Sequence, residues 1–158
     1  MARAREVSGF DCEEPFARAA ARVIDVRAAE VFEHSEGVLD IADVERVHDM
    51  RVATRRLRAA LELFEPCFPR KRWRKALRRV KALADALGER RDRDVEIEFL
   101  RGFTAEAPDA DRPALAARIE RLQEEQHRAN QELADFVAKN RLRKLRRRLR
   151  KLVRTAGR

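Results

Sequence analysis

The stretch VERVHDMRVATRRLRAALELF, residues 44–64, carries a histidine and five arginines on a helical pattern of apolar residues. Successive residues of an α-helix are 100° apart, so six apolar residues fall on one side and predict a buried face. These six are Met50, Ala53, Leu57, Ala60, Leu61 and Phe64. The opposite side collects four basic residues at steps of three, four and three, namely His48, Arg51, Arg55 and Arg58.

This basic row is about 15 Å long, because it covers ten helical steps with a rise of about 1.5 Å each. Like charges three or four residues apart repel, and they destabilise an isolated helix by roughly 0.2–0.5 kcal/mol per pair. A bound polyanion would relieve that repulsion, so the row is a candidate anion site. The pattern leaves open the alternative of a solvated helix face without a ligand.

Two other segments repeat the spacing of this row. Residues 70–87 carry Lys71, Arg74, Arg78 and Lys81, and residues 140–154 carry Arg141, Lys144, Arg148 and Lys151. If the three helices pack through their apolar sides, we expect some rows to converge on a groove that suits a linear polyanion. A solvated surface is a strong alternative for the last segment, because basic residues cover nearly all of its polar surface.

Helix-breaking and capping residues divide the chain into about six predicted helices. The expected helices cover about 15–36, 40–65, 70–87, 91–106, 111–139 and 140–154. Gly37 is the expected end of the first helix, Gly88 ends the third, Asp40 or Asp43 caps the second, and Asn140 caps the sixth. No segment alternates with a period of two for long enough to be a strand, so we predict one all-α bundle over residues 1–158.

The composition agrees with long amphipathic helices. The 158 residues are 44% hydrophobic and 41% charged, and only five are glycine. No apolar run has the length of a membrane span, and the first 16 residues lack the hydrophobic block of a signal peptide. We therefore expect a cytoplasmic protein.

The net charge of +9 is unevenly distributed along the chain. Residues 1–42 carry −4, residues 43–110 carry +4, and residues 111–158 carry +9. Arginine outnumbers lysine by 31 to 6, and its planar guanidinium suits bidentate phosphate contacts. The uneven distribution of charge points to an anionic partner. GC-rich coding is an alternative explanation for the excess of arginine over lysine.

Cysteine and histidine give no sign of a metal or cofactor site. Cys12 and Cys67 lie far apart in the sequence, and we expect two buried, reduced thiols. The histidines, His34, His48 and His127, form no pair of ligands one helical turn apart. Composition alone assigns no role to any of the three.

Two motifs resemble the CHAD family, the conserved-histidine α-helical domain. VHDMRVATRRLRAALELF is similar to the signature of that family, and ALADALGERRDRDVEIEFL is similar to its second motif, with Arg-Asp-x-Asp-Val after Leu-Gly. The resemblance implies an all-helical domain that binds inorganic polyphosphate in a basic channel, without catalysis, in proteins that can localise to polyphosphate granules.

The resemblance also implies which residues face the phosphates. In the first motif these are His48, Arg51, Arg55, Arg56 and Arg58. Lys81 is the candidate just ahead of Leu-Gly, and it extends the row with Arg74 and Arg78. In the second motif Arg91 is a candidate, although an ion pair of Arg91 with Asp92 that organises the helix start is an equal alternative. The spacing of the basic rows, and not the resemblance, adds Arg74, Arg78, Arg141, Lys144 and Arg148 as candidates.

The chain departs from the family in one respect. CHAD domains usually contain two related helical halves, each with a basic motif, whereas VHDMRVATRRLR occurs once in this chain. The chain therefore resembles one half, and we expect two copies to pair through a symmetric interface. A fragment of a longer protein is the alternative.

Two other function classes compete with polyphosphate binding. Nucleic-acid binding through the basic C-terminal helix is the alternative, but the chain has no tyrosine and one tryptophan to serve as a stacking platform. A phosphatase or nuclease would need clustered carboxylates or a nucleophile with its base. Asp92 and Asp94 are two residues apart, so they diverge on a helix, and we predict that the chain is not an enzyme.

Overall fold

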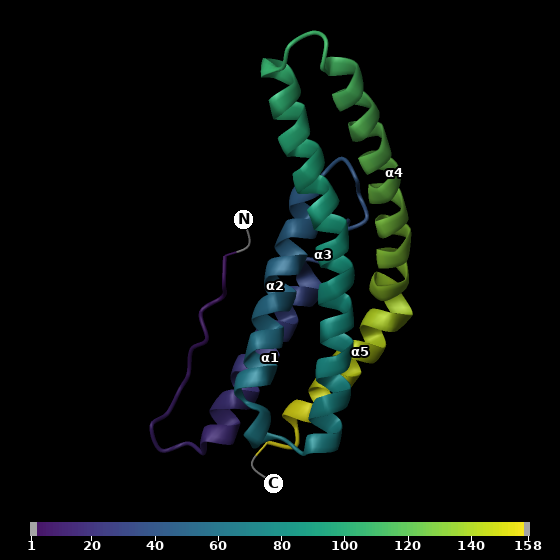
Figure 1. Cartoon of the computed structure of the whole chain (residues 1–158). Coiled ribbons are helices and arrows are strands. Elements are labelled where there is room, and N and C mark those ends of the chain that lie inside the picture. The colour runs from purple at the N-terminus through teal and green to yellow at the C-terminus, as the bar shows by residue number, and fades with distance from the viewer. Residues whose placement is uncertain (1–2, 157–158) are drawn as a thin grey trace.

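A computed structural model describes residues 3–156, which contain five α-helices and one short 3-10 helix. The helices are α1 (Phe16–Glu33), α2 (Val44–Leu63), α3 (Arg70–Glu106), α4 (Arg112–Val137) and α5 (Lys139–Val153), and the 3-10 helix is Glu65–Cys67. Figure 1 shows the arrangement. The predicted all-α bundle is confirmed, with five helices in place of six.

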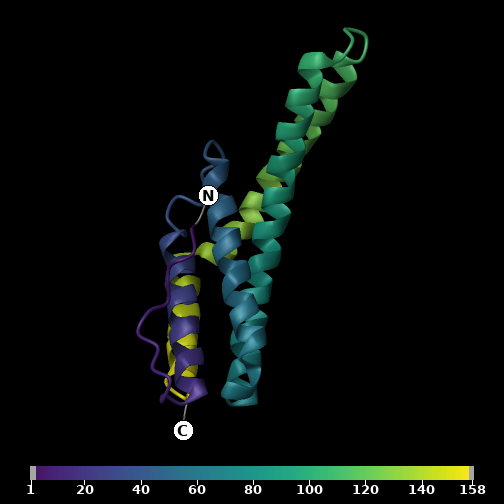
Figure 2. The same cartoon turned by 90° about the vertical axis from the view of Figure 1, so that its left-hand side faces the viewer.

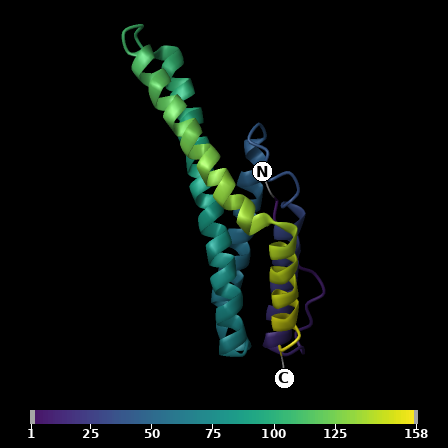
Figure 3. The same cartoon turned by 90° about the vertical axis from the view of Figure 1, so that its right-hand side faces the viewer.

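The helices form a four-helix body from which a hairpin extends. The body consists of α1, α2, the first half of α3, and α5, and in Figure 2 it occupies the lower half of the view. The second half of α3 and most of α4 form the hairpin, which reaches beyond the ends of α1 and α2 (Figures 1 and 2). In Figure 3, α5 runs beside the first half of α3.

The core of the body includes the apolar face predicted for residues 44–64. Met50, Ala53, Leu57 and Leu61 of α2 have no exposed surface. Helix α3 buries Trp73, Leu77, Val80 and Leu87 in the same core, and α5 buries Leu145, Leu149 and Leu152. The Trp73 ring Nε1 also donates a hydrogen bond of 2.7 Å to the backbone carbonyl of Leu61, which fixes α3 against α2.

The predicted break at Gly88 is wrong, because α3 runs without interruption from Arg70 to Glu106. A glycine inside a helix costs only about 1 kcal/mol relative to alanine. Apolar residues on both sides of Gly88, including Leu87 and Ile97, are buried and favour the helical conformation. Packing therefore outweighs the intrinsic preference of one glycine, and two predicted helices form one.

Other details predicted at the helix ends and cysteines also differ. Helix α1 ends at Glu33, and Gly37 lies beyond it in a turn with φ +68°. Asn140 lies inside α5 and does not cap it. Both cysteines are free, as expected, but Cys12 is exposed and Cys67 is partly buried. Burial raises the pKa of the Cys67 thiol, so it stays protonated at neutral pH.

The continuity of α3 can be tested with alanine at two glycines. A Cβ at Gly88 would meet no atom within 4 Å, so Gly88→Ala should stabilise the protein by about 1 kcal/mol. The melting temperature should rise by about 2–4 °C in a thermal scan followed by circular dichroism. Gly37→Ala is the control: its positive φ and the Arg46 Nη1 at 2.8 Å from the new Cβ predict a lower melting temperature. A decrease for Gly88→Ala would contradict an uninterrupted helix.

Candidate anion-binding site

The predicted basic row of α2 lies on the solvent side of the helix. Arg55 is exposed, and His48, Arg51 and Arg58 are partly exposed, whereas the apolar residues opposite them are buried. Arg56 is partly buried and already interacts with another group of the protein. The helical periodicity of residues 44–64 therefore identified the solvent-facing row correctly.

Glu62 joins the row of α2 to the predicted row of α3. Its Oε1 accepts hydrogen bonds of 3.1 Å from Arg58 Nε and 3.1 Å from Lys81 Nζ. Burial raises the pKa of Glu62, but the hydrogen bonds and charges of Arg58 and Lys81 outweigh burial and lower it overall. We call this surface, formed by His48, Arg51, Arg55, Arg58, Arg74, Arg78 and Lys81, the α2/α3 face.

A second and deeper basic site lies between α3 and α5. It is a cleft of about 1030 Å³, and we call it the α3/α5 cleft. Nine arginine and lysine side chains line it, against one carboxylate, that of Asp135. The nine are Arg72, Lys75, Arg79, Arg141, Lys144, Arg147, Arg148, Lys151 and Arg154. Leu83, Phe136 and Leu145 contribute apolar surface.

The cleft contains the predicted row of α5 but not the predicted row of α3. Arg141, Lys144 and Arg148 all line it. From α3 it takes Arg72, Lys75 and Arg79, each one residue later than the predicted Lys71, Arg74 and Arg78. One residue is 100° around a helix, so the two rows of α3 face different directions. A shallower hollow of about 510 Å³ lies along Arg70, Lys71, Arg74, Lys75 and Arg78, and Lys75 also lines the cleft.

The nine cations of the cleft have no anionic partner within residues 3–156. None of them forms an ion pair in that part of the chain, unlike Arg58 and Lys81 of the α2/α3 face. Unpaired charges of one sign in a concave site produce a strong positive potential and attract anions. Arginine and lysine also give charge-assisted hydrogen bonds to phosphate oxygens. The arrangement is therefore suited to binding a multivalent anion.

The second motif supplies a buried ion pair that differs from the predicted one. Asp92 is exposed and Arg91 partly exposed, whereas Arg90 and Asp94 are buried and paired with each other. Burial, and then the neighbouring charge of Arg91, lowers the pKa of Arg90. The motif is therefore structural at Arg90 and Asp94. An ion pair of Arg91 with Asp92, which was the alternative to a ligand contact of Arg91, does not form among the described residues.

This buried pair connects α3 with α4 and with the segment between α1 and α2. Gln126 Nε2 donates to Asp94 Oδ1 at 2.6 Å, and Arg90 Nε donates to Asn130 Oδ1 at 3.3 Å. Asn130 Nδ2 in turn donates to the carbonyl of Leu39 at 3.0 Å. The network lies where the hairpin leaves the four-helix body, so it fixes the hairpin to the body.

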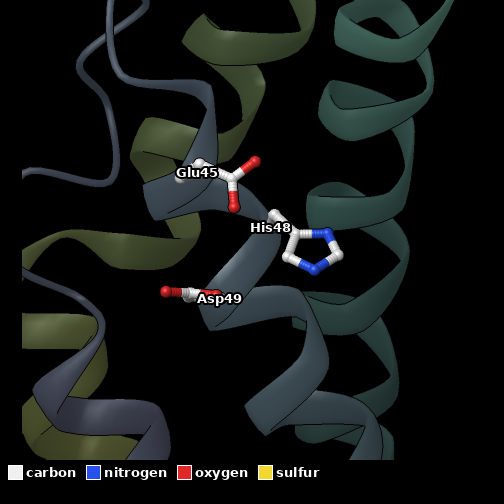
Figure 4. Close-up of side chains that lie close together, drawn as sticks. All are labelled: Glu45, His48 and Asp49. Atoms are coloured by element: carbon white, nitrogen blue, oxygen red, sulfur yellow. The ribbon is translucent and has the colours of Figure 1, made fainter. Parts of the chain in front are cut away.

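Three residues at the start of α2 form a group with metal-ligand chemistry that the sequence analysis did not identify. Glu45, His48 and Asp49 each offer one ligand atom, and these atoms lie within 4.8 Å of one another. Figure 4 shows them on the first turns of α2, with the His48 ring on the side of α3. The i, i+3, i+4 spacing is the signal that could have revealed them. Both carboxylates already interact with other groups of the protein.

These features define a class of protein: an all-helical domain with basic helix faces around a cleft. Residues 22–158 match the family model of the CHAD domain, so the chain belongs to the CHAD family. Comparison with curated proteins gives no match. Among the described helices, none has the length and apolar character needed to cross a membrane.

The buried pair can be tested with two aspartate variants. Asp94→Ala leaves the Arg90 guanidinium buried without its counter-charge, which typically costs about 3–5 kcal/mol. Asp92→Ala removes an exposed carboxylate two residues away and should change stability by less than about 0.5 kcal/mol. Urea unfolding of both variants measures the difference. Equal effects of the two substitutions would contradict a structural role for Asp94.

Proposed function

We propose that the chain binds inorganic polyphosphate without catalysing a reaction on it. The observation that carries this proposal is the α3/α5 cleft, where nine cations without an ion pair in residues 3–156 face one carboxylate. The CHAD family, to which the chain belongs, is linked to polyphosphate-related proteins. A chain of phosphates presents one negative charge after another, and the cleft offers cations along two helices.

The length of the basic surface favours a polymer over a single phosphate. Arg141 and Lys151 are ten residues apart on α5, about 15 Å at about 1.5 Å per residue. One phosphate ion contacts only a few side chains, whereas a linear polyanion contacts the whole row. Each contact releases counterions, so the affinity should fall steeply as the salt concentration rises. Lys75 lines both the cleft and the neighbouring hollow on α3, which gives the polymer a path towards the α2/α3 face.

The cleft offers few groups that could catalyse hydrolysis. The described residues that line it include one carboxylate and no histidine or cysteine. Hydrolysis of a phosphoanhydride by a metal-assisted route uses clustered carboxylates to hold the ions. Release of phosphate from polyphosphate in the presence of Mg²⁺ or Mn²⁺ would contradict the proposal that the chain binds polyphosphate without hydrolysing it.

Nucleic acid is the competing ligand, because its backbone offers the same charge. Stacking of bases needs exposed aromatic side chains, and Phe136 is the one aromatic residue that lines the cleft. Trp73 is buried in the core. We therefore expect polyphosphate to displace DNA or RNA from the protein, and the reverse displacement to fail at equal phosphate concentration.

We also propose that the protein acts in the cytoplasm, at polyphosphate granules.

Paired substitutions test the cleft directly. Arg79→Ala with Arg148→Ala removes one cation from each wall, and we expect at least a tenfold loss of affinity, because each charge-assisted contact contributes about 1.5–3 kcal/mol. The matched control is Arg121→Ala with Arg128→Ala, which makes the same charge change at exposed positions of α4. Titration with polyphosphate at two salt concentrations should give a smaller salt dependence for the cleft variant. Equal losses in both variants would show that only net charge matters.

Substitutions on the α2/α3 face test whether the polymer extends beyond the cleft. Arg51→Ala with Arg55→Ala should weaken binding severalfold, since both side chains are solvent-accessible. Glu62→Gln should strengthen it, because Arg58 and Lys81 lose the carboxylate that they share. Helicity measured by circular dichroism serves as the control for folding. If neither variant changes the affinity, binding is confined to the α3/α5 cleft.

A further inference from the structure

The end of the α3/α5 cleft next to helix α4 differs in chemistry from the rest of the cleft. Asp135 and Phe136 line it there, directly before the end of α4 at Val137. Helix α5 begins at Lys139, so both residues lie at the end of the cleft where α5 starts (Figure 3). They are the one carboxylate and the one aromatic side chain among the described residues that line the cleft. A cleft that bound only phosphate groups would need neither of them.

Aliphatic side chains extend the apolar surface of Phe136. The Phe136 side chain is 37% exposed, so part of it is accessible to a ligand. Leu83 is the last residue of α3 that lines the cleft. Because α3 and α5 run in opposite directions, Leu83 lies towards the same end as Phe136 (Figures 1 and 3). An aromatic ring beside aliphatic side chains suits a planar ring of a ligand that stacks on it.

Asp135 places a negative charge in a cleft that otherwise attracts anions. The residue is exposed and forms no ion pair within residues 3–156, although nine cations line the same cleft. Its carboxylate repels phosphate groups and therefore opposes the binding of inorganic polyphosphate. An ionised carboxylate only accepts hydrogen bonds, so it favours a ligand that carries N–H or O–H donors in addition to phosphates.

We propose that this end of the cleft binds the base of a nucleoside polyphosphate, with guanine as the preferred base. The inference rests on the proposed function, because the cations of the cleft hold the phosphate chain. Guanine presents two neighbouring donors, N1–H and the 2-amino group, which match the two carboxylate oxygens of Asp135. The guanine ring stacks on Phe136. The phosphates extend from there along α5, past Arg141, Lys144 and Arg148.

Other bases fit this end of the cleft less well. Adenine presents an acceptor at N1, where guanine presents a donor, so its lone pair faces the carboxylate of Asp135. Hypoxanthine keeps the N1–H donor but lacks the 2-amino group. A site that hydrogen-bonds its ligand discriminates against analogues that lack the donor. One aromatic ring is sufficient for a single base, whereas a nucleic-acid strand stacks successive bases on several rings.

Calorimetric titration of the full chain with four ligands, in the absence of divalent cations, tests the base site. Inorganic tripolyphosphate lacks a base, and guanosine, inosine and adenosine triphosphates carry the same number of phosphates. Stacking and two hydrogen bonds should make guanosine triphosphate bind at least about tenfold tighter than tripolyphosphate. Inosine triphosphate should lie between guanosine and adenosine triphosphates. An affinity for guanosine triphosphate no higher than that for tripolyphosphate, or equal to that for adenosine triphosphate, would overturn the inference.

Asp135→Asn separates recognition of the base from electrostatic attraction. It should weaken the binding of guanosine triphosphate about tenfold, because the asparagine amide cannot accept both donors. Tripolyphosphate should bind equally well or more tightly, because a repulsive charge is lost. Phe136→Leu should weaken all three nucleotides severalfold and leave tripolyphosphate unchanged.

The matched control is Glu132→Gln, which makes the same charge change one helical turn earlier, at an exposed position outside the cleft lining. It should preserve the preference for guanosine triphosphate over tripolyphosphate. Changes of the same sign and size for both ligands in Asp135→Asn would show that the carboxylate acts only through its charge, and would overturn the inference.

Failure of the base site and failure of the proposed function give different results. If neither tripolyphosphate nor long-chain polyphosphate binds, the proposed function is wrong. If both bind and the nucleotides have no advantage over tripolyphosphate, only the base site is wrong. Long-chain polyphosphate should also displace guanosine triphosphate from the wild type, because both occupy the cleft. Independent binding of the two ligands would place the nucleotide elsewhere and overturn the inference.

Discussion

The buried ion pair of Arg90 and Asp94 holds the two parts of this molecule together. A guanidinium without exposed surface needs a counter-charge. Asp94 provides it, Asn130 accepts a hydrogen bond from Arg90 Nε, and Gln126 donates to Asp94. Asn130 extends the network to the backbone at Leu39, while Arg90 Nη2 and Asp94 Oδ2 have no hydrogen-bond partner among the described residues. Because these groups come from α3, α4 and the segment before α2, the position of the hairpin depends on them.

Helix α3 forms a wall of both basic surfaces. Its row at Arg74, Arg78 and Lys81 accompanies α2, and its row at Arg72, Lys75 and Arg79 faces α5. The two surfaces differ in how far their positive charge is compensated by ion pairs. Glu62 partly neutralises the α2/α3 face, whereas the cations of the α3/α5 cleft lack ion pairs within the described residues. The cleft therefore carries the less compensated positive charge of the two candidate sites.

The sequence was sufficient for features that depend on one helix at a time. The apolar and basic sides of residues 44–64 follow from helical periodicity, and so does the row of α5. Features that depend on the packing of two helices could not be predicted from the sequence. Basic residues in the segment RKRWRKALRR point in two directions around the helix. Only the position of α5 decides that Arg72, Lys75 and Arg79 line the cleft. Likewise, the burial of Arg90 and Asp94 requires α4 with its Gln126.

The uninterrupted course of α3 has a consequence for how a ligand would adapt to the protein. A helix of 37 residues has no joint, so the basic residues near its beginning keep fixed positions relative to one another. A flexible polyanion would therefore have to follow the course set by these residues, because the wall of the cleft that α3 forms does not bend to meet the ligand. The free energy of ordering would then fall mainly on the polymer and not on the protein.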